Sequence, residues 1–166
     1  AEFLQLAVKQ GVTGRVEVAD LGAEQVEEEL SPLHAEAYDA VERGDLAAAA
    51  AAFEQALTQD PSDEDARLGL AQVSLMARTQ GVDLQQAREA AAADPTDVDA
   101  AIMVADLDVL GGHVEDAFAR LVDVVRATQE DERERAKAHL LDLFEVVGAQ
   151  DERVRRGRTA LMSALF

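Results

Sequence analysis

Apolar residues recur three and four positions apart along most of the chain, which is the spacing of an amphipathic α-helix. Turns that contain glycine or proline separate the segments with this pattern. Together the segments predict an all-α fold of four helix pairs, at 33–43 with 46–59, 63–79 with 83–93, 97–110 with 114–128, and 131–147 with 151–165. Residues suited to the start of a helix precede three of the pairs, at Ser31-Pro32, Ser62-Asp63 and Thr96-Asp97.

The helix pairs recur with a constant period. Ala37, Ala71 and Ala105 stand 34 positions apart, each inside the first helix of a pair. A small residue at this place lets the two helices of a pair approach closely. A 34-residue helix pair of this kind resembles the tetratricopeptide repeat (TPR). The resemblance implies a right-handed α-solenoid, with repeats at about 31–63, 64–97, 98–131 and 132–166.

Turn residues follow the same period. Gly44 and Gly112 fall at the turns inside the first and third pairs, where a positive φ costs little only for glycine. Pro61 and Pro95 lie 34 positions apart, each after the second helix of a pair. Proline cannot continue a helix, so each of these residues is expected to end one repeat and begin the next.

Three parts of the chain depart from the repeat. In the second pair the turn at 81–83 comes about three residues late, which predicts a longer first helix and a shorter second one. In the fourth pair His139 and Arg153 stand where small residues are expected, which is typical of a terminal repeat. Residues 1–30 show a short amphipathic helix pattern, which Gly11 ends, and then a linker.

The composition excludes several classes of function. The chain has 166 residues, with 34 Asp and Glu against 15 Lys and Arg, so its formal net charge is −19. A surface this acidic repels nucleic acids and anionic membranes, and we expect neither as a partner. Cysteine is absent, which excludes disulfides, thiolate metal sites and cysteine nucleophiles from this chain. No apolar run approaches the roughly 20 residues of a membrane span.

No constellation of residues in the sequence points to an enzyme. His34, His113 and His139 lack metal-binding spacing and clustered carboxylates, and we expect roles in packing or turns for them. Gly111-Gly112 is not part of a phosphate-binding motif. The sequence therefore predicts no catalytic, cofactor-binding or metal-binding residue, and no cofactor.

The first helices of a TPR stack line a concave groove, and the groove positions of this chain are mainly apolar. Methionine side chains adapt to varied apolar segments, which favours the binding of protein segments. The alternative is that several of these side chains, above all Leu68, Leu75 and Ile102, belong to the core. None is Lys, Arg or Asn, so a clamp for acidic C-terminal tails is not expected. The predicted groove residues are Tyr38, Val41, Leu68, Gln72, Leu75, Met76, Ile102, Met103, Asp106 and Val109.

A cluster of basic residues in the last predicted helix reverses the charge locally. It consists of Arg153, Arg155, Arg156 and Arg158. One interpretation is a secondary patch that binds an acidic partner or an adjoining domain. The other is that these arginines pair with acidic neighbours of their own chain, either 142 and 145 or 151 and 152.

Several stretches resemble a particular group of TPR proteins, the bacterial thioredoxin-like co-chaperones of the YbbN/CnoX (chaperedoxin) family. The resemblance covers residues 31–166, and its most specific part is the stretch 140–148 followed by 158–161. In that family a thioredoxin fold precedes the repeats, so the resemblance implies that residues 1–30 are the end of that domain and a linker. The other similar stretches are 33–38, 42–46, 69–73, 104–108, 111–112 and 117–118.

The resemblance implies a cytoplasmic holdase-like co-chaperone. Members of the family bind unfolded or oxidation-damaged proteins and pass them to Hsp70-type or chaperonin machinery. We therefore expect unfolded clients as partners. One alternative is a scaffold or adaptor for one specific protein partner. Another is an auxiliary domain of a thioredoxin-type redox protein. Fold alone does not decide among these roles.

Overall fold

The computed structural model describes residues 31–166, and within this range every element is a helix. Each of the eight predicted helices is present, with both ends within one residue of the expected positions. The predicted helix and linker at 1–30 lie outside the described residues. The helices are α2 (Pro32–Glu42), α3 (Leu46–Gln59), α4 (Glu64–Thr79), α5 (Leu84–Ala93), α6 (Val98–Leu110), α7 (Val114–Ala127), α8 (Glu130–Val147) and α9 (Glu152–Leu165).

Short polar side chains begin most of these helices. The predicted caps are confirmed: the side chains of Ser31, Asp63 and Asp97 each accept a hydrogen bond from the backbone N–H three residues ahead. Such bonds satisfy backbone donors that have no partner in the first helical turn. The turn glycines Gly44 and Gly112 have φ values of +74° and +86°, as predicted.

The Asp-Pro turns before the second and third pairs have the same pattern of hydrogen bonds. The Asp60 carboxylate accepts hydrogen bonds from the hydroxyl and the backbone N–H of Ser62, at 2.6 and 2.9 Å. Asp94 accepts the same two bonds from Thr96, also at 2.6 and 2.9 Å. The hydroxyl bond is the main reason why the pKa values of both carboxyl groups are lowered.

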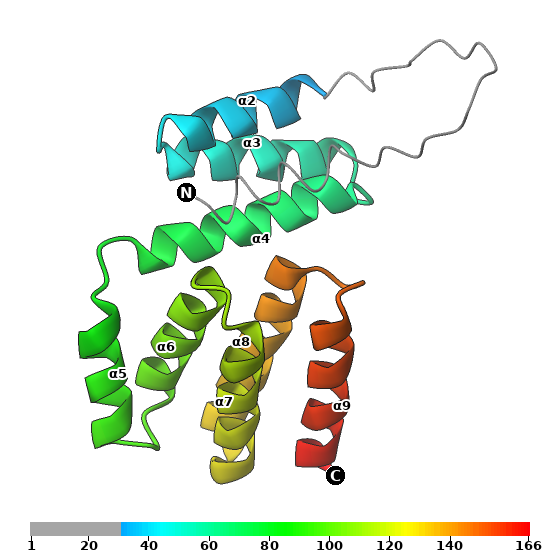
Figure 1. The fold of residues 1–166 in the computed structure, drawn as a ribbon. Coiled ribbons are helices and arrows are strands. Elements are labelled where there is room, and N and C mark those ends of the chain that lie inside the picture. The colour runs from blue at the N-terminus through cyan, green and yellow to red at the C-terminus, as the bar shows by residue number, and fades with distance from the viewer. Residues whose placement is uncertain (1–30) are drawn as a thin grey trace, which may run out of the picture.

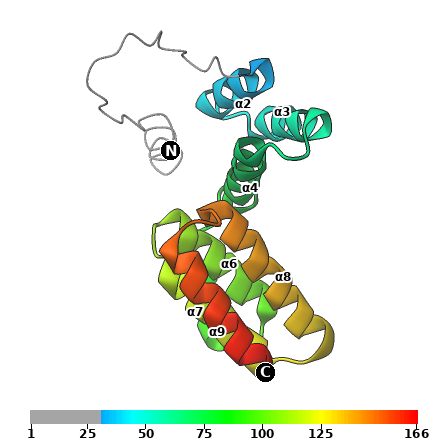
Figure 2. The ribbon, with the colours of Figure 1, turned by 90° about the vertical axis from the view of Figure 1, so that its right-hand side faces the viewer.

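The buried side chains form two cores that meet at α4. The first core joins α2, α3 and one face of α4, and its centre is Phe53. The second core joins α6, α7, α8 and α9, and receives Leu75 from α4. Figures 1 and 2 show α4 between the two groups, lying across the upper ends of α6 and α8. We call α2–α4 the N-terminal unit and α5–α9 the C-terminal bundle.

The two helices of the second predicted pair do not pack against each other, which corrects the pairing predicted for 63–79 and 83–93. Helix α5 packs against α6, has almost no contact with α4 and contributes no fully buried residue. Helix α4 packs instead against α3, α8 and α6. The predicted late turn is confirmed. Helix α4 is the longer helix, the chain turns at Gly81, and α5 then runs beside α6 (Figure 1).

Candidate functional site

A buried carboxylate joins the two units of the molecule. Asp106 of α6 has no exposed surface, and its two oxygens bind the Arg78 guanidinium of α4 at 2.6 and 3.0 Å. One of these oxygens also lies 2.6 Å from Nε2 of His139 in α8. Burial by itself would raise the pKa of Asp106, but the hydrogen bonds from His139 and Arg78 lower it overall. The carboxylate therefore ties α4, α6 and α8 together.

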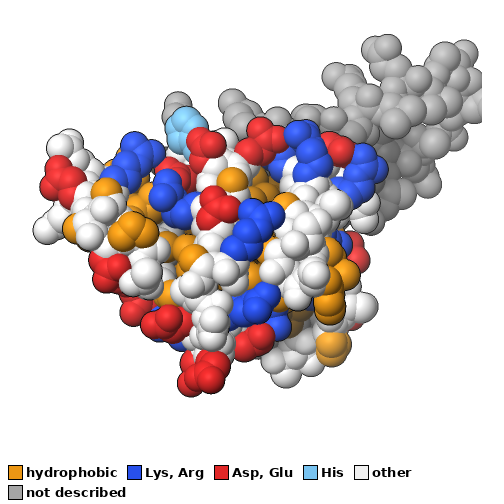
Figure 3. Space-filling model, turned by 90° about the horizontal axis from the view of Figure 1, so that it is seen from below, with side chains coloured by type: hydrophobic (Ala, Val, Ile, Leu, Met, Phe, Trp, Pro, Cys, Tyr) orange, Lys and Arg blue, Asp and Glu red, His pale blue; other side chains and the backbone are white. Residues whose placement is uncertain are grey.

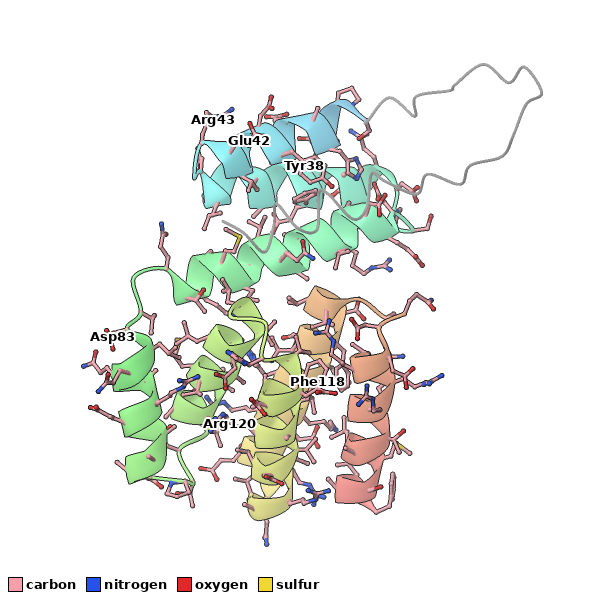
Figure 4. The ribbon with its side chains drawn as sticks, viewed as in Figure 1. Tyr38, Glu42, Arg43, Asp83, Phe118 and Arg120 are labelled. Atoms are coloured by element: carbon pink, nitrogen blue, oxygen red, sulfur yellow. The ribbon has the colours of Figure 1, made fainter. Side chains whose placement is uncertain are left out.

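A second buried aspartate, two positions along α6, points toward other helices. Asp108 binds the Arg88 guanidinium of α5 at 2.8 Å and that of Arg120 in α7 at 3.5 Å. Figure 4 shows Arg120 on the side of α7 that faces α6, while Phe118 lies on the side that faces α9. Helix α6 thus uses two aspartates to hold α4, α5, α7 and α8.

The sequence did not reveal these ion pairs. Asp106 was expected in an open groove and His139 only as a packing residue, while Arg78, Arg88 and Asp108 were not singled out. The partners lie 12–33 positions apart in the sequence, so no local motif indicates that they pair. A usable signal was present in Asp106 and Asp108, which interrupt the apolar second half of α6, because buried carboxylates require cationic partners.

The predicted groove is closed at four of its ten positions, and this corrects the prediction there. Gln72, Leu75, Asp106 and Val109 are buried. The physical reason is that α8 packs against α4 and α6, and that Val109 belongs to the core of the C-terminal bundle. The Gln72 side-chain amide donates a hydrogen bond of 3.3 Å to the Val146 carbonyl in the last turn of α8.

The other six groove residues remain partly exposed. Tyr38 and Val41 pack against the core of the N-terminal unit, and Ile102 packs against the second core. The Tyr38 ring meets Phe53 edge to face, with ring centroids 5.8 Å apart. The partly exposed set is Tyr38, Val41, Leu68, Met76, Ile102 and Met103.

The surroundings of the Tyr38 hydroxyl are acidic. Burial raises its pKa above the usual value, and the charges of Asp65 and Asp63 at the start of α4 raise it further. Tyr38 is therefore an uncharged phenol at neutral pH. In Figure 4 its side chain lies between α2 and the helices below it.

The arginines of α9 have partners in their own chain. Arg153 binds Asp151 at 2.7 Å, Arg155 pairs with Glu152, and Arg156 binds Glu115 of α7 at 2.9 Å. The Arg158 guanidinium carbon lies 5.9 Å from the centre of the Phe144 ring. Seen from below, acidic, basic and apolar side chains are intermingled on the C-terminal bundle, without one large basic patch (Figure 3).

A shallow groove between α7 and α9, with a volume of about 230 Å³, was not predicted. Its lining is apolar along Phe118, Val122 and Ala160, and Arg153 and Arg156 stand at its edge. Among residues 31–166, no three His, Asp or Glu side chains come together in a way that could hold a metal ion. In the same range no helix combines the length and apolar character needed to cross a membrane.

The repeated helix pairs and the polar contacts between them define the class of this chain as a helical-repeat protein. Comparison with known families gives the particular one: models described as "Tetratricopeptide repeat" match residues 77–166 and 40–78. The chain belongs to the tetratricopeptide repeat family. TPR domains are generally non-catalytic modules for protein–protein interaction.

Curated proteins of two mycobacteria are similar to this chain. "Uncharacterized protein Rv1324" of Mycobacterium tuberculosis and "Uncharacterized protein Mb1359" of Mycobacterium bovis are each 34% identical to it over 149 residues. The matched region covers 87% of this chain and 48% of each relative. The chain thus spans about half the length of the curated relatives it matches. No solved structure matches it significantly.

Proposed function

We propose that this chain is the client-binding domain of a holdase-like co-chaperone, which keeps unfolded or damaged proteins from aggregating. The observation that supports this role is the set of six partly exposed apolar side chains on α2, α4 and α6. Two of them, Met76 and Met103, are unbranched and polarizable, which suits clients of varied sequence. The resemblance of residues 31–166 to thioredoxin-like TPR co-chaperones favours the same role, with transfer of clients to Hsp70-type or chaperonin machinery in the cytoplasm.

The experiment is light scattering of insulin reduced with dithiothreitol, with and without the chain at an equal molar ratio. The reductant leaves this chain unchanged, because it contains no cysteine. Suppression of the scattering is the expected result. A scattering curve identical to that of insulin alone would overturn the holdase role.

The burial of four predicted groove residues favours a second candidate, an adaptor for one specific partner. A surface partly covered by α8 offers fewer apolar contacts to clients of varied sequence than an open groove would. The adaptor role predicts no effect on insulin aggregation. The third role is an auxiliary domain of a thioredoxin-type redox protein, in which another domain would supply the thiols, because this chain contains no cysteine.

A further inference from the structure

Helix α4 presents different faces to the two units. Val73 and Ala66 belong to the core of the N-terminal unit, whereas Leu75 belongs to the core of the C-terminal bundle. Gln72 and Arg78 reach the same bundle through their hydrogen bonds to Val146 and Asp106. Residues 72, 75 and 78 are spaced three apart and so follow one side of the helix. This side, which we call the α8-facing side of α4, carries an amide, an apolar side chain and a cation.

Helix α8 packs against α4 and α6, the two helices that carry most of the predicted groove residues. Two of the four buried groove residues bind α8 directly: Gln72 bonds the Val146 carbonyl and Asp106 bonds His139. The groove positions on α2 and those at 68, 76, 102 and 103 stay partly exposed. In addition, the Val146 carbonyl belongs to the last turn of α8, where carbonyls have no partner within the helix, and Gln72 supplies one.

The connection between α4 and α5 leaves α5 independent of α4. It consists of residues 80–83, and Gly81 has a φ of +75°. Because α4 and α5 have almost no contact, movement of α4 would leave the packing of α5 on α6 intact. The N-terminal unit keeps its own core around Phe53. The contacts to be broken are those of α4 with α8 and α6.

We propose that the α8-facing side of α4 is a helix-binding surface, which α8 occupies in the isolated chain and from which an amphipathic helix of a client displaces it. The proposal rests on the client-binding function proposed above. The client helix presents an apolar stripe to Leu75 and a carboxylate to Arg78. The carboxylate is needed because Arg78 loses its ion pair with Asp106 when α4 moves away from α6.

The probe is a synthetic amphipathic peptide of 18 residues, the length of α8, with leucines along one side and one glutamate in line with them. The control peptide has glutamine in place of that glutamate. Spin labels on Gln55→Cys and Glu145→Cys, exposed positions in α3 and α8, report the distance between the two units. The natural chain has no cysteine, so labelling is confined to these two sites.

The expected result is a second, longer distance between the labels when the glutamate peptide is added. In Asp106→Asn, the contact of α4 with α6 is weaker because a neutral amide binds Arg78 less strongly than a carboxylate does. The peptide should therefore bind to this variant about tenfold more tightly. In Arg78→Gln, the preference for the glutamate peptide over the glutamine peptide should disappear. Unchanged label distances at saturating peptide, or failure of the peptide to bind, would overturn the proposal.

The outcome is separable from that of the insulin experiment. Suppression of aggregation without a change in label distance would support the holdase role and contradict displacement of α8. A distance change with the glutamate peptide, but no suppression, would support the helix-binding surface and contradict the holdase role. A destabilised Asp106→Asn protein would not obscure this result, because the label distance is measured in the chain with its natural Asp106.

Discussion

The ring of Phe53 in α3 lies directly against the backbone of Gly69 in α4. A Cβ atom built on Gly69 would overlap Cζ of Phe53, at a distance shorter than any real contact between such atoms. The same ring meets His34 and Tyr38 of α2 edge to face, with centroids 6.1 and 5.8 Å apart. Phe53 therefore holds all three helices of the N-terminal unit, and the missing side chain at 69 sets the distance between α3 and α4.

Gly69→Ala should lower the free energy of unfolding, although alanine is the better helix former. Alanine gains about 1 kcal/mol in helix propensity. Overpacking against the Phe53 ring costs about 1–3 kcal/mol, because the ring is held on three sides and cannot easily move. A net loss measured by urea unfolding is the expected result. The double variant Gly69→Ala with Phe53→Leu should lose less than the sum of the two single changes, and strict additivity would contradict this explanation.

The sequence was sufficient to predict where the helices begin and end, but not how they all pack against one another. Helix ends follow from local chemistry, such as the caps at Ser31, Asp63 and Asp97, and all were placed to within one residue. The contact of α4 with α8 forms because α5 packs on α6 after Gly81 and leaves α4 uncovered. Which helix then covers α4 depends on residues far apart in the chain. The repeat pattern describes neighbouring pairs, so it could not show that the groove is partly covered.

Asp106→Ala should destabilise the chain much more than the removal of an exposed carboxylate from the same helix. The change leaves the imidazole of His139 and the guanidinium of Arg78 without their partner in a largely buried place. Breaking such a pair costs about 3 kcal/mol, toward the lower end of the usual range because the Arg78 side chain is 32% exposed.

The matched control for this substitution is Asp99→Ala. Asp99 also lies on α6, and its pair with Arg135 is exposed on both sides. Such a pair contributes about 0.5 kcal/mol or less. Urea unfolding of both variants checks the prediction, and equal losses would mean that the buried position of Asp106 is not what matters.

The stability contributed by Asp106 should disappear at acidic pH. Its pKa is lower in the folded chain than in the unfolded one, so the unfolded chain binds the proton first as pH falls. The contribution is fully present well above the unfolded value of about 4 and is lost as pH falls through the lower folded value. Urea midpoints measured between pH 7 and pH 2.5 should therefore fall less steeply with acid in Asp106→Asn than in the natural chain. Parallel curves would contradict the prediction.

The double substitution Met76→Glu and Met103→Glu should abolish client binding and leave the helical content unchanged. Both side chains are partly exposed, so the new carboxylates can reach water, but they place charge where an apolar client segment would lie. We expect at least a tenfold weaker interaction with reduced insulin, measured by fluorescence anisotropy, together with an unchanged far-ultraviolet circular dichroism spectrum. The third methionine gives a matched control, because Met162 lies on α9, is 56% exposed and is not part of the groove set. Met162→Glu should bind clients normally. Loss of helical structure in the double variant would show that Met76 and Met103 support the fold, and equal loss of binding in Met162→Glu would place the client surface on α9 instead.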